Sequence, residues 1–155
     1  MTRRSRPPVT SNPSRQPPTV AVSGGWRSAW LAYRACARRG GPVTLVHVYL
    51  GTPAGLRTLR ACVALVQWLR RQYGDAAVTL HEIGVNVTPG CSVPQLHDIV
   101  DFFVPRDAVR ADGTESAVDA VADLGDLLRE LAYCEYPPDC GQCEPCREIA
   151  AAREA

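Results

Sequence analysis

The sequence contains no lysine, because all 17 of its basic residues are arginine. The chain therefore has no amine for a Schiff base and no lysine for a Walker A phosphate loop. It also lacks any apolar run of about 18 residues, so we expect no transmembrane helix. The first residues lack the apolar segment of a secretory signal. We therefore predict a cytoplasmic protein whose cysteines stay reduced.

What the sequence does contain fits a single globular domain. At 155 residues and 46% hydrophobic composition, the chain is long enough to bury a substantial core. Residues 1–18 differ from the rest, because they hold five prolines, four arginines and almost no apolar side chains. We expect this segment to be a disordered tail. Its arginines could contact nucleic acid, although a solvated tail explains them as well.

The charge is distributed unevenly. Residues 19–97 carry eight arginines against two acids, a net charge of +6. Residues 98–155 carry five arginines against fourteen acids, a net charge of −9. A basic first half suits an anionic ligand. Solvated helix faces would give the same pattern, and the sequence leaves both interpretations open.

The first half of the chain alternates strands with helices. Short β-branched runs predict strands at Thr19–Ser23, Val43–Leu50 and Ala77–Val85. Helical periodicity predicts helices at Trp26–Arg39 and Ala54–Arg71. Right-handed crossovers between such strands give a parallel sheet. We therefore predict an α/β, Rossmann-like fold with helices on both faces of the sheet and a ligand site at the carboxyl ends of the strands.

The second half is less regular. We interpret residues 86–97 as a loop, and the apolar run 99–104 as either strand or helix. Asp112 followed by Glu115 resembles a capping box, which predicts a long helix ending near Tyr133. We take residues 19–133 as the main domain and residues 134–155 as a separate C-terminal segment.

Three further residues belong to types that bind metals. His47 lies inside a predicted strand, and we interpret it as a core histidine in preference to a ligand. Cys91 and His97 lack other donors at ligand spacing, so we interpret them as loop residues.

A glycine turn joins the first predicted strand to the first helix. Ser23, Gly24, Gly25 and Ser28 form a Ser-Gly-Gly-x-x-Ser motif, with Arg27 at its second variable position. Backbone N–H groups and the positive end of the helix dipole would face a ligand there, as in a phosphate cradle. A tight turn required only for chain geometry would look the same.

Four cysteines cluster near the C-terminus. Cys134, Cys140, Cys143 and Cys146 include two overlapping C-x-x-C units, and Gly141 permits a tight turn between them. Four soft ligands at this spacing favour a structural zinc ion, since the protein fills every position of a tetrahedron. An iron–sulfur cluster and redox-active thiols are the alternatives that we favour less.

The loop and the cysteines together resemble the 7-cyano-7-deazaguanine synthase family of the PP-loop ATP pyrophosphatases. Those proteins have a Ser-Gly-Gly-x-Asp-Ser loop and a four-cysteine zinc site that ends in arginine, as Cys146-Arg147 does here. The stretch Val46-His47-Val48-Tyr49 resembles the second strand of the family, and Val104-Pro105-Arg106 resembles part of its Val-Pro-Gly-Arg-Asn segment. The resemblance implies an adenine nucleotide alpha hydrolase-like fold.

The resemblance also implies an activity. ATP would activate the carboxylate of 7-carboxy-7-deazaguanine, ammonia would form the amide, and a second activation would give the nitrile. The resemblance implies ATP and Mg²⁺ as cofactors, with the ATP phosphates held by the loop residues Ser23, Gly24, Gly25, Arg27 and Ser28. The chain differs from the family in three respects: Arg27 replaces the loop aspartate, the middle is shorter, and a lysine before the cysteines has no counterpart. The alternative is a non-catalytic relative that binds a nucleotide or a protein partner.

The expected partners follow from this resemblance. They are a nucleotide and a 7-deazaguanine small molecule, with no membrane, and a homodimer is compatible with the sequence. We do not expect nucleic acid as a direct partner, because the cysteine segment is acidic (Glu135, Asp139, Glu144 and Glu148).

Overall fold

The computed structural model describes residues 16–39, 41–87, 90–134 and 140–155. Most of the predicted tail, residues 1–15, therefore lies outside the described residues. Residues 16–18 lead into the first strand, and the Pro18 carbonyl accepts a hydrogen bond from Thr44 N at 2.9 Å.

A three-stranded parallel sheet lies at the centre of the fold. Its strands, in the order β1-β2-β3, are β1 (Thr19–Ala21), β2 (Val43–Leu50) and β3 (Val78–Val85). Helices α1 (Trp26–Arg39) and α2 (Pro53–Tyr73) connect them, and a short 3-10 helix, η1 (Asp75–Ala77), precedes β3. The predicted β-α-β-α-β order and the α/β class are confirmed.

The chain later returns to the free edge of β1. Val109 forms a parallel bridge with Val20, in which Ala21 N donates to Val109 O and Val109 N donates to Thr19 O, both at 2.9 Å. The segment through Val109 thus lies beside β1, on the side away from β2. In parallel sheets, ligands bind beyond the carboxyl ends of the strands, at the point where the strand order reverses. Here that point is β1, which has β2 on one side and the Val109 segment on the other.

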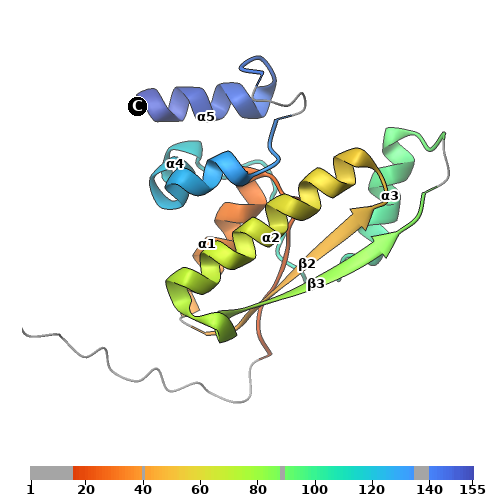
Figure 1. Cartoon of the computed structure of the whole chain (residues 1–155), viewed down its shortest axis with the longest axis horizontal. Helices are drawn as coiled ribbons and strands as arrows, with labels where there is room; N and C mark the ends of the chain where they lie inside the picture. Colours follow the sequence, from red (N-terminus) through yellow and green to blue (C-terminus); the bar gives the residue numbers. More distant parts are fainter. Residues whose placement is uncertain (1–15, 40, 88–89, 135–139) are drawn as a thin grey trace, which may run out of the picture.

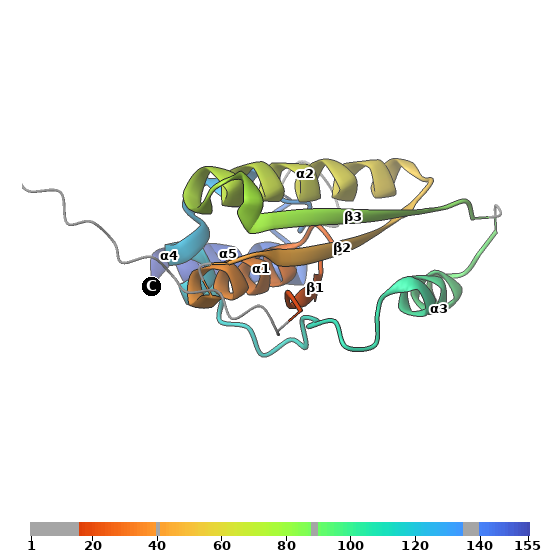
Figure 2. The same ribbon diagram turned by 90° about the horizontal axis from the view of Figure 1, so that it is seen from below.

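The two faces of the sheet bury different residues. Successive strand side chains alternate between faces, and the set containing Val20, Val43, Leu45 and Val78 packs into one core with residues of α1 and α2. The opposite set, represented by Val48, belongs to a smaller second core. Figure 2 shows α2 and α3 on opposite sides of the strands.

Helix α3 (Val93–Phe103) corrects the prediction of a loop at residues 86–97. Ser92 caps the helix: its hydroxyl accepts from Gln95 N at 3.4 Å, and the Gln95 side chain accepts from Ser92 N at 2.8 Å. This reciprocal pair is a capping box, and it starts a helix six residues before the apolar run. That run, undecided from the sequence, is the C-terminal part of α3, which lies beyond the carboxyl ends of β2 and β3 (Figure 1).

The long helix predicted from Asp112 to Tyr133 is also corrected. Asp112 and Glu115 form a turn, in which the Glu115 carboxylate accepts from Asp112 N at 2.9 Å. The N-cap is Ser116, and it starts α4 (Ala117–Leu124). Helix α4 ends at Gly125, because this residue has a positive φ of 52°. A 3-10 helix, η2 (Gly125–Glu130), follows.

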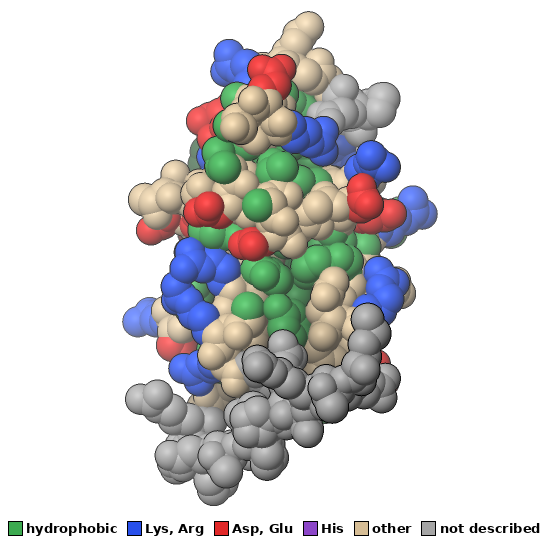
Figure 3. Space-filling model, turned by 90° about the vertical axis from the view of Figure 1, so that its left-hand side faces the viewer, with side chains coloured by type: hydrophobic (Ala, Val, Ile, Leu, Met, Phe, Trp, Pro, Cys, Tyr) green, Lys and Arg blue, Asp and Glu red, His purple; other side chains and the backbone are tan. Residues whose placement is uncertain are grey.

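The last helix, α5 (Glu144–Glu154), lies beside α4 at the opposite end of the molecule from α3 (Figure 1). Its Ile149 is fully buried in the main core, so the C-terminal segment is packed against the domain. On the face shown in Figure 3, apolar side chains gather along the middle, and acidic and basic side chains lie mostly to either side of them. Over the described ranges, no helix combines the length and the apolar character needed to cross a membrane.

Candidate functional site

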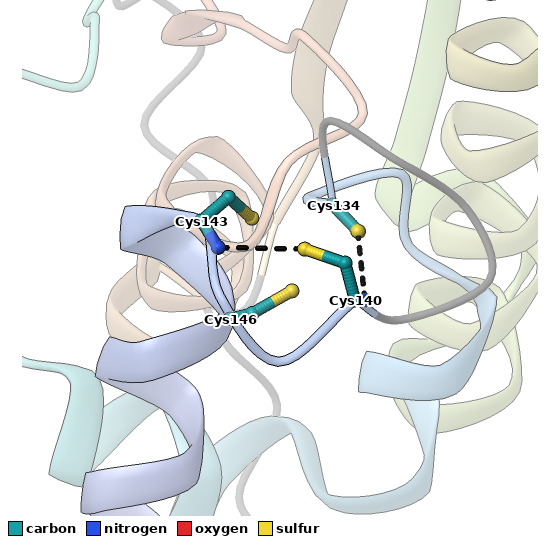
Figure 4. A group of neighbouring side chains, drawn as sticks. All are labelled: Cys134, Cys140, Cys143 and Cys146. Carbon is teal, nitrogen blue, oxygen red and sulfur yellow. Dashed lines mark hydrogen bonds between the residues drawn. The ribbon is translucent and has the colours of Figure 1, made fainter.

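The four predicted cysteine ligands come together in space. The sulfur atoms of Cys134, Cys140, Cys143 and Cys146 all lie within 4.8 Å of one another. Their side chains point toward a common centre (Figure 4). Four thiols at this spacing could hold a metal ion, and the donor set is compatible with structural zinc.

Backbone donors surround the sulfur of Cys140. Cys143 N and Gln142 N both donate to it at 3.4 Å. These hydrogen bonds, with Cys143 first, lower the pKa of the Cys140 thiol to about 6. The neighbouring sulfur of Cys134 accepts from Cys140 N at 3.3 Å. The turn therefore favours the thiolate, which is the form of cysteine that binds metals.

The two serines of the glycine turn hold its backbone in place. The Ser28 hydroxyl accepts from Ser23 N at 3.0 Å and lies 3.1 Å from the Ser23 hydroxyl. Gly24 has a φ of +88°, and a Cβ there would lie 2.9 Å from the Thr58 carbonyl oxygen of α2. Gly24 is therefore required both for its backbone conformation and for the close approach of α2.

The guanidinium of Arg27 is paired with acidic side chains from the second half of the chain. Its Nη2 forms an ion pair with Glu148 Oε1 of α5 at 2.5 Å, and its Nε lies 3.7 Å from Glu115 Oε2. The Glu115 side chain is only 4% exposed. Arg27 also covers the ring of Trp26, at 4.7 Å from its centroid. At this position, two glutamates from the acidic second half of the chain neutralise an arginine from the basic first half.

The glycine turn and the cysteine segment are joined directly. Ala132, two residues before the first cysteine, donates its N–H to Gly24 O at 2.8 Å. Glu148, two residues after the last cysteine, binds Arg27. Both ends of the cysteine segment are therefore attached to the turn that follows β1.

A pocket of about 460 Å³ opens at the carboxyl ends of β1 and β2. Strand ends, the start of α2, the α3 region and the segment after it all line the pocket. Of the predicted loop residues, Ser23 and Ser28 line it, whereas Gly24, Gly25 and Arg27 are not among its lining residues. Its location agrees with the ligand site predicted from the sheet topology.

Two polar residues at the pocket, His47 and Arg110, were not predicted to lie at a ligand site. The interpretation of His47 as a core residue is confirmed, because only 2% of its surface is exposed, and the residue also lines the pocket. Burial lowers the pKa of His47, while its hydrogen bond to Val22 O and the charge of Glu82 oppose that shift. Arg110 lies at the pocket, where its guanidinium donates to Asp101 Oδ1 at 2.6 Å. The position of His47 near the end of β2 is the sequence feature that could have indicated its place at the pocket.

Comparison of the chain with protein-family models, with curated proteins and with solved structures gives no significant match. The proposals below therefore depend on the geometry of the site and on the motifs themselves.

Proposed function

We propose that the chain is a zinc-containing, nucleotide-binding α/β protein related to the 7-cyano-7-deazaguanine synthases. One observation carries the proposal: the Ser23–Ser28 turn, the adjacent pocket and the four-cysteine cluster are joined into one region by Ala132 and Glu148. In this proposal the nucleotide lies in the pocket with its phosphates toward the start of α1. A helix N-terminus stabilises negative charge through its free N–H groups and its dipole.

Zinc fits the donor set at the C-terminus. Cys134, Cys140, Cys143 and Cys146 would hold the ion, and no position would remain for water or substrate. Its role would therefore be to stabilise the fold. Zinc would connect the segment before the cluster to α5, whose Ile149 is part of the main core.

The first candidate reaction is the ATP-dependent conversion of 7-carboxy-7-deazaguanine and ammonia to the nitrile. The chain would hold the pyrophosphate leaving group at the turn, where the Ser23 and Ser28 hydroxyls line the pocket. Mg²⁺ is a poorer fit: no aspartate or glutamate is among the residues that line the pocket. We therefore derive no step that uses this ion.

Arg27 favours a second candidate, a non-catalytic nucleotide-binding or partner-binding relative. The family has an aspartate at this position, whereas here an arginine is held by Glu148 and Glu115. In the second candidate this ion-pair cluster has a structural role, and the turn binds its ligand without turnover.

Incubation of the zinc-loaded protein with ATP, Mg²⁺, ammonia and 7-carboxy-7-deazaguanine separates the two candidates. Carboxylate-dependent release of both AMP and pyrophosphate supports the ligase. Saturable ATP binding by calorimetry, with no product, supports the second candidate. A folded, zinc-loaded protein that does not bind ATP overturns both.

A variant in which the charges of Arg27 and Glu148 are exchanged tests whether Arg27 separates the two candidates. Arg27→Asp alone places a third carboxylate beside Glu115 and Glu148, and we expect it to destabilise the protein. The double variant Arg27→Asp/Glu148→Arg restores an ion pair of opposite polarity and places the family's aspartate in the turn. Turnover by the double variant, with a silent wild type, would identify Arg27 as the residue that abolishes catalysis.

A further inference from the structure

His47 is a buried polar residue that lines the pocket, and its tautomer can be assigned. His47 Nδ1 lies 2.9 Å from the carbonyl oxygen of Val22. A carbonyl oxygen only accepts hydrogen bonds, so Nδ1 must carry the proton. In the neutral ring the other nitrogen, Nε2, is then an acceptor.

No strong donor satisfies His47 Nε2 within the described residues. Its neighbour there is the hydroxyl of Thr58, at the long distance of 3.4 Å. That hydroxyl has a single hydrogen, and it donates to Gly55 O at 2.8 Å. The Nε2 lone pair therefore has no close donor, and it belongs to a pocket-lining residue that is 2% exposed. A buried acceptor without a close donor is a place where a ligand gains affinity.

The rest of the pocket restricts the ligand further. Its walls are largely apolar, with side chains from β2 and α3 such as Val46, Val48 and Val100. Among the described residues that line it, Arg110 is the only charged one, and its guanidinium is already bound to Asp101. A charged ring placed among these walls would lose hydration without compensation.

We infer that the pocket binds a neutral, largely apolar molecule, such as a nitrogen-containing ring, whose N–H or O–H group donates a hydrogen bond to Nε2 of His47, which makes His47 the specificity-determining residue of this site. The volume of about 460 Å³ is within the range of small-molecule sites. The inference deepens the proposed function and rests on it only in taking this ring to be the base of the nucleotide.

Two probes of matched shape test the inference. Indole presents a ring N–H donor, and benzofuran has an oxygen acceptor in the same place. We expect the zinc-loaded protein to bind indole about tenfold more tightly in a ligand-observed NMR titration, because only indole can pair with Nε2. The ¹⁵N resonance of Nε2 in histidine-labelled protein should shift with indole. Equal affinities, or no binding of either probe, would overturn the inference.

Two variants of His47 provide the control. His47→Asn keeps an N–H near the Nδ1 position for Val22 O but has no acceptor at the Nε2 position, so the preference for indole should disappear. His47→Gln can place an amide oxygen near the Nε2 position, so the preference should partly return. Zinc content and circular dichroism establish that each variant is folded. A preference that survives in His47→Asn contradicts the assignment.

An ATP titration of the same wild-type sample separates this inference from the proposed function. A preference for indole without ATP binding would leave the inference standing and overturn the nucleotide proposal. ATP binding without a preference for indole would leave the nucleotide proposal standing and overturn the inference about His47.

Discussion

The two faces of the sheet differ in how completely they are covered. Under α1 and α2, a core of 22 buried residues extends through α4 and η2 to α5. On the opposite face, the second core has three buried residues within the described part of the chain, Val48, Val104 and Ala108, and the pocket opens beside them. The first face supplies most of the burial that stabilises the fold. The second leaves room for a ligand, as expected if binding regions are drawn from the less stable parts of a protein.

The largest expected effect comes from removing one of the cysteines that we propose bind zinc. Cys146→Ser should abolish zinc binding and release α5 from the core. Structural zinc contributes roughly 10 kcal/mol or more in zinc-finger peptides, so we expect a loss of at least about 4 kcal/mol here. That loss lowers Tm by at least about 10 °C, as measured by calorimetry.

Cys91→Ser is the matched control for this variant, because Cys91 lies outside the cluster. It should leave both zinc content and Tm unchanged. A Cys146→Ser protein that retains stoichiometric zinc and the wild-type Tm would contradict the assignment of the metal ligands.

Substitution of two valines of β2 allows the packing of the two faces of the sheet to be compared directly. Val43 is fully buried under the main core, and Val48 lines the pocket on the other face. Val43→Ala should cost about 2–3 kcal/mol, because it leaves a closed cavity. Val48→Ala should cost only about 1 kcal/mol, because it enlarges a space that is already open. Urea unfolding of both variants measures the difference, and equal costs would show that the two faces are packed equally well.

The glycine turn after β1 provides the next comparison. Gly24→Ala should cost about 1–3 kcal/mol and weaken ATP binding, because Gly24 has a positive φ and contacts the Thr58 carbonyl. Gly25→Ala should be tolerated, since a Cβ at Gly25 meets only the Ser23 hydroxyl, at 3.5 Å. If both variants behave alike, the turn does not have the conformation described here.

The smallest effect is a pH dependence that arises from His47. Burial lowers its pKa in the folded protein below the usual 6.5. The unfolded chain therefore binds a proton before the folded protein does, as the pH falls. The contribution of His47 should be constant above about pH 6.5 and should decrease at lower pH. Unfolding free energies of the wild type and His47→Asn should converge as the pH falls, because only the wild type loses the contribution of His47; the cysteines titrate in both proteins, so their effect cancels in the difference. A constant difference would contradict the buried, neutral state of His47.

Much of the first half of the fold could be predicted from the sequence. The bounds of α1 and β2 agree with the prediction, because apolar periodicity and flanking glycines determine them locally. The cysteine cluster was also predicted, since the spacing of its ligands is a local property of the chain.

The errors and omissions have separate physical causes. The start of α3 depends on the Ser92–Gln95 capping box, which the loop-like composition around it concealed. The ion pair of Arg27 with Glu148 joins residues 121 positions apart, a separation that no local pattern encodes. The placement of His47 in the pocket depends on Thr58 of α2 lying across from β2, which is a consequence of tertiary packing.

A calorimetric titration of ATP into the zinc-loaded protein tests the nucleotide-binding proposal most directly, with the Gly24→Ala variant titrated in parallel. We expect saturable binding of one ATP per chain to the wild type, clearly weakened in Gly24→Ala. Absence of saturable binding at millimolar ATP, in a sample shown to be folded and to contain one zinc ion per chain, would contradict it.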